Sequence, residues 1–591
     1  MRFRLPILAA VVACLGTLGL DDAADAGRPN ILIAISDDQS YPHASAYGTP
    51  AVSTPAFDRV ARAGVLFHQA FAPAPGCSPM RAAFLTGREI WQIGPAGTHA
   101  SSFPGDLPVF PQQLRESGYH VGMTGKGWGP GNFRVDGWEH NPAGPGYNRH
   151  KIDSPPGISN NDYAKNFGDF LEARQDGQPF CFWYGGSEPH RSYHPGIGRA
   201  NGIDPARVPV PGFLPDSEEV RDDIADYFFE IGWFDDHLGR MLDLLEERGE
   251  LKNTLVIVTS DNGMPFPRAK ANLYEYGIHM PLAIAWPARI PGGRVTHDLV
   301  SLLDVTRTIF EATEVEPRQA AAMAGIGMLR GLTRDPREPD DDPGPDDDPG
   351  PDDDPGPGEG VGPGEGVGPG EGVGADGGDG AVPETETGIT ARAAVFAGRE
   401  RHSSSRFHTL GYPCRAIRTA THLYIRNFAP ERWPAGTPRK IEGAKFDHEG
   451  KLVEGELGDP HGGYHDIDDC PTLRWMIAHR QAPDVAPRLA AAVGHRPAVE
   501  LYEITTDPDC MNNLAGDPDQ AEIQAELASR LAGYLTRTGD LRQTDPAAAD
   551  VWETYPRYSP LRWFPTPDWA RENPERIPDQ PWLEQRRPRV E

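Results

Sequence analysis

The sequence predicts an α/β fold built around a large, mostly parallel sheet, followed by a smaller C-terminal α+β domain. Apolar runs of strand length alternate with helical patterns through the first half of the chain, which is typical of βαβ units. Short strand-like segments and a helix then follow an acidic Pro/Gly-rich block. With 591 residues, the chain is long enough for one large domain and a smaller one.

The elements of the large domain alternate in a regular order. We expect strands at 30–36, 65–71, 119–124, 179–184, 254–259 and 281–286, and helices at 54–63, just after Cys77, and at 109–117, 161–174, 216–248 and 300–311. The run NILIAIS at 30–36 is apolar throughout, as in a parallel strand covered on both faces. Thr54 and Pro55 offer an N-cap and a first-turn proline, so the first helix is expected to begin there.

Four regions divide the chain. We predict a signal peptide at 1–26, the large domain at 27–333, a linker at 334–390, and the smaller domain at 391–591, with strands at 393–397, 414–418 and 422–427 and a helix at 520–535. The linker contains DDDPGP three times and then GEGVG repeats. Because this composition cannot bury a core, we expect a disordered acidic spacer.

Acidity is concentrated in that linker. Residues 338–380 hold 15 acidic residues and no Lys or Arg, which is half of the formal net charge of −30. Nucleic-acid binding requires a basic face, so we expect no nucleic-acid partner. A local cationic pocket could still bind an anionic substrate.

The N-terminus has the pattern of an export signal. Arg2 and Arg4 precede an apolar run at 5–20, and the small residues at 24–26 offer a cleavage site. We expect the protein in the periplasm or outside the cell, with an uncleaved anchor or acylation at Cys14 as alternatives. The cysteines after residue 26 lie at 77, 181, 414, 470 and 510. Because five is odd, at least one is unpaired within the chain, and we expect it to be Cys77.

Polar side chains follow the carboxyl ends of several predicted strands. They are Asp37, Asp38, Lys126, His190, Asp261 and Asn262. Ligands of open α/β sheets bind at this edge, although Asp and Asn also populate ordinary turns. Since four separate strand ends carry ligand-type side chains, we favour a functional site.

The segment from Cys77 to Arg81 reads Cys-Ser-Pro-Met-Arg, and Leu-Thr-Gly-Arg ends the following stretch at Arg88. Pro79 suits the first turn of a helix, which places Cys77 at a helix N-terminus, where an anion is favoured. Arg81 lies one turn further along on the same face.

This extended motif closely resembles the signature of type I, formylglycine-dependent sulfatases. The resemblance implies an alkaline-phosphatase-like sandwich and hydrolysis of sulfate esters or sulfamates, with a sulfated carbohydrate as substrate. It implies that a formylglycine-generating maturation enzyme oxidises Cys77 to Cα-formylglycine, whose hydrate is the nucleophile. A homodimer is compatible with the family.

The same resemblance assigns a metal site. The stretch from Arg28 to Asp38 is similar to the family's opening strand and first metal motif, and the stretch from Ser260 to Gly263 to its second. The expected ligands are Asp37, Asp38, Asp261 and Asn262, completed by residue 77. Oxygen donors rich in carboxylates suit Ca²⁺, whereas Mg²⁺ demands tighter octahedral geometry.

The sulfamidase branch of the family, the heparan N-sulfatases (N-sulfoglucosamine sulfohydrolases), is the most similar. The segments that carry this resemblance are 188–191 (EPHR), 261–267 (DNGMPFP), 272–274 (NLY) and 501–514.

The resemblance also implies roles for individual residues. Arg81 would hold the nucleophile, Lys126 and Lys270 would bind sulfate oxygens, and His190 would protonate the leaving group. Arg268 competes with Lys270 because the spacing tolerates a shift.

The sequence departs from the family pattern at one position. The family commonly has a histidine two residues after its active-site lysine, but here Trp128 follows Lys126 and Gly127. His99 is our candidate for a replacement base.

Two other functions compete with the sulfatase assignment. One is a phosphatase or phosphonate hydrolase of the same superfamily, whose metal site typically carries more His and Asp ligands. The other is a non-catalytic homologue that binds sulfated glycans, which would follow if Cys77 stays a thiol.

Overall fold

The computed structural model describes residues 27–334, 388–390 and 392–590. The predicted signal peptide and nearly all of the predicted acidic spacer lie outside the described residues. None of the helices in the described ranges combines the length and the apolar character that a membrane span requires.

The central sheet has the strand order β3-β4-β1-β5-β6-β2-β7, with β8 pairing β2. Its strands are β1 (Asn30–Ser36), β2 (Val65–Phe71), β3 (His120–Gly125), β4 (Phe180–Gly185), β5 (Thr254–Ser260), β6 (His279–Ala285), β7 (Arg294–Thr296) and β8 (Val300–Ser301). All neighbours are parallel except β6, which runs antiparallel to both β5 and β2. The predicted α/β fold with a mostly parallel sheet is confirmed.

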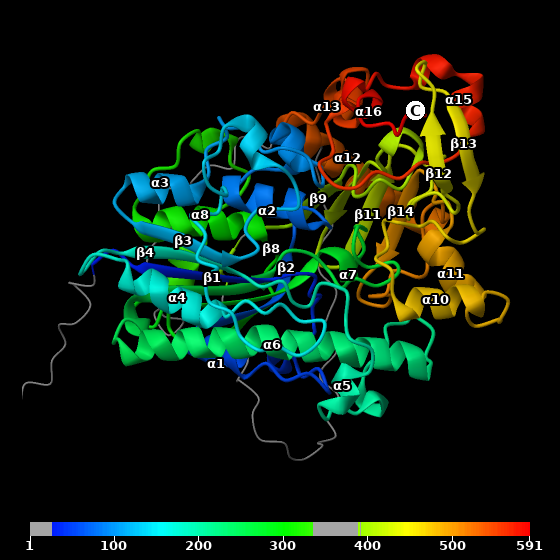
Figure 1. Cartoon of the computed structure of the whole chain (residues 1–591). Coiled ribbons are helices and arrows are strands. Elements are labelled where there is room, and N and C mark those ends of the chain that lie inside the picture. Colours follow the sequence, from blue (N-terminus) through cyan, green and yellow to red (C-terminus); the bar gives the residue numbers. More distant parts are fainter. Residues whose placement is uncertain (1–26, 335–387, 391, 591) are drawn as a thin grey trace, which may run out of the picture.

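Helices cover both faces of this sheet (Figure 1). One layer contains α1 (Pro55–Ala63), α4 (Tyr163–Glu172) and α6 (Glu218–Glu247), and the other contains α2 (Cys77–Thr86), α3 (Phe110–Glu116) and α8 (Leu302–Thr313). Short helices α5 (Ile197–Ala200), α7 (Glu275–Ile278) and α9 (Leu329–Thr333) lie in the connections. Alternate residues of β1 enter different cores, Ile31 and Ile33 on one face and Leu32 and Ala34 on the other. Burial on both faces explains why this strand is apolar throughout.

Two local predictions need correction. Helix α1 starts at Pro55 as expected, but the Thr54 side chain does not cap it. The carboxylate of Asp235 on α6 accepts the N–H groups of Ala56 and Phe57 instead, at 2.8 and 2.7 Å. The helix predicted at 300–311 begins two residues later, because its first two residues form β8.

A smaller antiparallel sheet, with the order β14-β11-β10-β9, follows the linker. Its strands are β9 (Val395–Arg399), β10 (Cys414–Arg418), β11 (His422–Asn427) and β14 (Val499–Glu503). Around it lie α10 (Pro471–Ala478), α11 (Ala486–Val493), α12 (Ala521–Arg537), α13 (Leu541–Thr544), α14 (Val551–Thr554), α15 (Asp568–Glu572) and α16 (Pro581–Glu584). The predicted smaller α+β part is confirmed, with β9 shifted by two residues.

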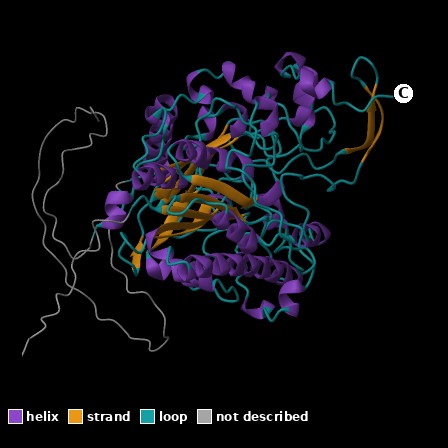
Figure 2. Cartoon of the chain, turned by 60° about the vertical axis from the view of Figure 1, so that its left-hand side comes forward, coloured by secondary structure: helices purple, strands orange, loops and turns teal. Residues whose placement is uncertain are grey.

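Several elements were not predicted, among them a hairpin in the C-terminal part. A separate hairpin of β12 (Ile441–Phe446) and β13 (Leu452–Leu457) projects from the C-terminal part of the molecule (Figure 2).

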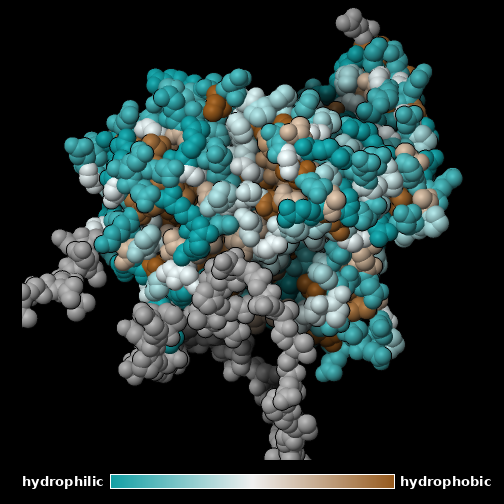
Figure 3. All heavy atoms as spheres, turned by 90° about the horizontal axis from the view of Figure 1, so that it is seen from below, coloured by the Kyte–Doolittle hydropathy of each residue, from teal (hydrophilic) through white to brown (hydrophobic). Residues whose placement is uncertain are grey.

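The face of the molecule seen from below in Figure 3 is mainly hydrophilic, and its hydrophobic residues form small, scattered groups. Such a distribution is normal for a surface that contacts water.

The two sheets are joined by shared packing. Phe71 and Tyr274 from the first part belong to the same buried cluster as Val395 and Tyr502 from the second. A buried ion pair between Arg418 and Glu275, with Nε and Oε1 2.6 Å apart, adds a polar link. This contact holds the C-terminal part against the large sheet.

Candidate active site

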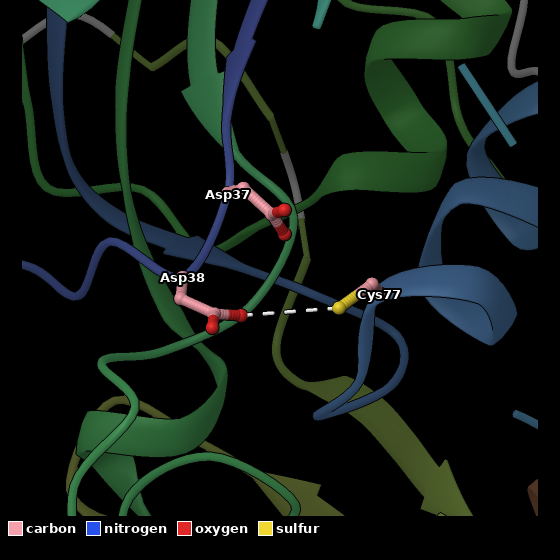
Figure 4. A group of neighbouring side chains, drawn as sticks. All are labelled: Asp37, Asp38 and Cys77. Atoms are coloured by element: carbon pink, nitrogen blue, oxygen red, sulfur yellow. Dashed lines mark hydrogen bonds between the residues drawn. The ribbon is translucent and has the colours of Figure 1, made fainter. Parts of the chain in front are cut away.

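Strand order alone brings the predicted side chains together. Strands β3, β4, β1 and β5 are parallel neighbours, so their carboxyl ends meet at one edge of the sheet. Lys126 follows β3, His190 lies in the loop after β4, the pair Asp37 and Asp38 follows β1, and the pair Asp261 and Asn262 follows β5. Helix α2 brings Cys77 to the same place, where its thiol faces Asp38 (Figure 4).

Asp38 is the centre of this cluster. Its Oδ1 accepts a hydrogen bond from Asn262 Nδ2 at 2.7 Å and lies 3.9 Å from Cys77 Sγ. Its backbone N–H donates to Asp261 Oδ1 at 3.1 Å. The backbone of Asp38 is left-handed, with φ of 76°. A non-glycine residue in this conformation is uncommon and is typical of functional sites.

Arg81 ties α2 to the strand ends. Its Nε donates to Asp261 Oδ2 at 2.7 Å, and one Nη donates to the carbonyl of Lys126 at the same distance. The other Nη is buried, has no hydrogen-bond partner and lies 3.9 Å from Asp37 Oδ1. A buried guanidinium with a free N–H is suited to bind an anionic oxygen beside residue 77.

Two lysines neutralise the carboxylates. Lys126 Nζ contacts both oxygens of Asp37, at 2.7 and 2.6 Å, and Lys270 Nζ contacts Asp38 Oδ2 at 2.6 Å. Burial would raise the pKa of Asp37, but Lys126, followed by His190 and Arg81, holds it well below the ordinary value. Burial would lower the pKa of both lysines, but Asp37 and Asp38 keep these pKa values above the ordinary range. Both lysines therefore remain cationic.

Cys77 is a poor nucleophile as a thiol. Burial raises the pKa of its thiol well above the ordinary value, against the pull of Lys126 and Lys270. Only a thiolate is a strong nucleophile, so an unmodified Cys77 would be unreactive at neutral pH.

His190 has one nitrogen free for chemistry. Its Nδ1 lies 2.6 Å from the carbonyl oxygen of Arg191. A carbonyl only accepts, so Nδ1 carries a proton. The remaining Nε2 faces the cluster, 3.8 Å from Asp38 Oδ2, and the side chain is 34% exposed. An imidazolium in this position can deliver its Nε2 proton to a group that leaves towards solvent.

The donor set fits a hard cation. Asp37, Asp38 and Cys77 place potential ligand atoms within 4.8 Å of one another. The carboxylate of Asp261 is joined to this group, and Asn262 Oδ1 is buried without a hydrogen-bond partner. A buried amide oxygen left unpaired is costly unless something binds it. Three carboxylates and an amide oxygen are donors of the kind that Ca²⁺ prefers.

Asp468 also belongs to the site and was not predicted. Its Oδ2 accepts from Lys270 Nζ at 2.9 Å, and with Asp38 and His190 it forms a second group of potential metal ligands. Lys270 Nζ already contacts the carboxylates of Asp38 and Asp468, so the negative charge of these two groups is compensated without a second metal ion. Asp468 lies between the hairpin β12–β13 and helix α10, and no strand-end pattern marked it.

His402 was also missed. A Cβ added to Gly76, the residue before Cys77, would lie 3.0 Å from His402 Nδ1. The ring of His99 packs against that of His402, with centroids 4.5 Å apart. Burial lowers the pKa of His402 to about 3, so this imidazole is neutral. His402 is therefore a second candidate for the replacement base that we assigned to His99.

The structure also shows what the side chains of Arg268 and Trp128 contact. The Arg268 guanidinium points away from the cluster and donates to the carbonyls of Ala491, at 2.7 Å, and Cys510. Lys270, and not Arg268, is the cation at the site. Trp128 is buried, and its Nε1 donates to the carbonyl of Ser78 at 3.0 Å, so it supports the backbone beside residue 77.

These features define a class of protein. Residues 29–315, which form the large α/β part of this chain, match the family model described as Sulfatase.

Named relatives agree with this family. N-sulphoglucosamine sulphohydrolase of Homo sapiens is 33% identical over 338 residues, which cover 51% of this chain and 63% of the human protein. N-acetylgalactosamine-6-sulfatase of Canis lupus familiaris is 28% identical over 393 residues, covering 55% and 71% of the two chains. The chain thus matches less than two thirds of the human relative's length.

A solved structure shares the fold. A protein in complex with its substrate D-glucosamine-2-N,6-O-disulfate aligns with a TM-score of 0.53 at 18% identity, over 88% of this chain and 99% of that protein. The likeness extends across both sheets of the present chain.

Proposed function

We propose that this protein hydrolyses sulfate esters or sulfamates on a sulfated glycan. One observation carries the proposal: Cys77, three carboxylates and two lysines converge from separate segments on one sheet edge. That edge combines a helix N-terminus, cations for a sulfate group and a partly exposed histidine for the leaving group. This combination suits transfer of a sulfuryl group from an oxygen or nitrogen to water.

The proposal includes two groups that this chain would acquire. Cys77 would be oxidised to Cα-formylglycine by a formylglycine-generating maturation enzyme, and Asp37, Asp38, Asp261 and Asn262 would hold Ca²⁺. Together these groups would supply a hydroxyl nucleophile beside a cation that stabilises negative charge. The high pKa of the Cys77 thiol supports the need for such a modification.

The chain's own side chains bind and orient the substrate. Lys126 contacts Asp37 and Lys270 contacts Asp38, and both lysines can bind the sulfate oxygens as charge develops on them. Arg81 fixes residue 77 relative to β5 through its bond to Asp261. His190 gives its Nε2 proton to the departing oxygen or nitrogen.

We predict that His190→Gln lowers kcat by about 10²- to 10⁴-fold on a sugar sulfate, whose leaving group needs a proton. The loss should be much smaller with 4-nitrophenyl sulfate, because nitrophenolate leaves without protonation. Steady-state rates on the two substrates measure the difference. His194→Gln is the control, since His194 is exposed in the same loop. Equal losses on both substrates would exclude the proton-donor role.

Removal of the cation should abolish turnover reversibly. We expect activity to disappear in EGTA and to return with CaCl₂. At a calcium concentration about a hundred times Kd, binding adds about 2.7 kcal/mol to the free energy of unfolding, which a thermal melt can detect. Full recovery with Mg²⁺ but not with Ca²⁺ would contradict the calcium assignment.

The linkage that is cleaved is the finer part of the proposal. The 33% identity to N-sulphoglucosamine sulphohydrolase supports an N-sulfated glucosamine as substrate. The similarity to N-acetylgalactosamine-6-sulfatase supports an O-sulfated sugar as the alternative substrate. Sulfate release from N-sulfoglucosamine and from glucosamine 6-O-sulfate decides between them. Release from the O-sulfate alone would exclude the sulfamidase assignment.

A phosphatase is the less favoured function. Phosphatases of two-metal type use paired ions about 3.5–4 Å apart. Here the second ligand group already contacts the ammonium of Lys270. Faster turnover of an aryl phosphate than of an aryl sulfate would reverse this preference. We also propose that the protein is exported, which cell fractionation of the native host would test.

A further inference from the structure

A cavity lies in the C-terminal part, beside the hairpin β12–β13. This hairpin cavity has a volume of about 640 Å³ and lies between the hairpin and the C-terminal segment that carries Trp563. Ile441 N–H donates to the Trp563 carbonyl at 2.7 Å, and Phe446 N–H donates to the Pro588 carbonyl at 2.8 Å. The hairpin is therefore fixed over the cavity at both ends of β12, at the projecting edge seen in Figure 2.

The lining combines aromatic rings with cations. Phe446 and Trp563 meet edge to face with centroids 4.7 Å apart, and Phe564 lies beside them in the wall. No Asp or Glu lines the cavity in the described part of the chain, although the protein as a whole is acidic. Lys451 and Arg562 line it, and neither side chain forms an ion pair or hydrogen bond with another described residue. Such a surface favours an anionic ligand with an apolar face.

The wall also contains unsatisfied polar groups. His408 Nδ1 and Thr409 Oγ1 are buried and have no hydrogen-bond partner. Both residues have left-handed backbones, with φ of 52° and 53°, which is strained for a β-branched residue such as Thr409. Buried polar atoms without partners, on a strained segment, indicate a site that a hydroxyl-rich ligand completes.

The wall of the hairpin cavity is linked electrostatically to a residue beside the catalytic cluster. The backbone N–H of Arg562 donates to Ser404 Oγ at 2.9 Å, and the ring of Phe564 packs near His465, with centroids 6.3 Å apart. Arg562 also lies within electrostatic range of Asp468, whose carboxylate holds Lys270. One ligand chain could thus occupy both places.

We propose that the hairpin cavity is a second carbohydrate site, which binds another anionic unit of the same glycan whose sulfate is hydrolysed beside Cys77. The ring of Trp563 would stack on the sugar ring, and Lys451 and Arg562 would bind its sulfate or carboxylate. Hydroxyl groups would pair with His408 and Thr409. The choice of a sulfated glycan rests on the proposed function, whereas the cavity itself does not.

Binding by a protein that cannot turn over tests this site. Calorimetry would measure the affinity of full-length Cys77→Ala protein for a sulfated glucosamine–uronate hexasaccharide. Adding Lys451→Ala or Arg562→Ala should weaken binding about tenfold each, since each loses one charge-assisted contact. Lys445→Ala is the matched control, because Lys445 is on the same hairpin, pairs with Glu454 and does not line the cavity. Lys451 is exposed, so its loss should not unfold the protein.

The outcomes separate the two proposals. Unchanged affinity in both cavity variants, or equal affinity for the desulfated hexasaccharide, overturns the second site. A wild-type protein that releases no sulfate, yet loses hexasaccharide affinity with Lys451→Ala, refutes the proposed function and supports the second site.

Discussion

Cys77→Ala should remove sulfate hydrolysis almost completely, by a factor on the order of a thousand or more, because the proposed nucleophile is built on this side chain. The fold should persist, since the thiol hydrogen bond that Cys77 forms among the described residues is a long one, to Asp38 at 3.9 Å. Sulfate release from 4-nitrophenyl sulfate measures the loss.

The control removes a different buried thiol. Cys181 lies in β4 and is buried in the hydrophobic core, away from the catalytic cluster. Cys181→Ala should retain turnover and lose only some thermal stability. Comparable activity in the Cys77→Ala protein would mean that another residue attacks sulfur.

Asp261→Asn should abolish activity and also destabilise the fold. The substitution removes a charge that faces Arg81 Nε at 2.7 Å, and both side chains are fully buried. Breaking one half of a buried ion pair costs about 3 kcal/mol, because the other charge stays buried without compensation. The same change removes one proposed ligand of the cation.

Urea unfolding and sulfate release measure the two effects separately. Asp243→Asn is a matched control, because Asp243 pairs with Arg59 on the surface at 2.7 Å with 63% of its side chain exposed. That variant should lose less than about 1 kcal/mol and keep its activity. An active, stable Asp261→Asn protein would contradict the role given to the Arg81–Asp261 pair.

Much of the fold could be predicted from the sequence because its signals are local. The run NILIAIS is apolar at every position, and β1 is buried at every position. Polar residues directly after such strands are informative, since parallel neighbours end at the same edge. That reasoning correctly brought Asp37, Lys126 and Asp261 to one place.

The rest depended on tertiary contacts that no local pattern encodes. Asp468 reaches Lys270 from the segment before α10, a helix that packs on α6 of the large part. The capping of α1 by Asp235 required knowing that α6 lies beside it. The choice between Arg268 and Lys270 depended on which way each side chain turns, and spacing along the chain could not decide it.

The mass of the tryptic peptide at 63–81, taken from protein made by its native host, tests the central claim most directly. Trypsin cleaves after Arg62 and Arg81, so this peptide contains Cys77 and no other cysteine. We predict that residue 77 appears as the aldehyde or its hydrate. A peptide that carries only the unmodified thiol would contradict the account and leave a protein that binds sulfated glycans without hydrolysing them.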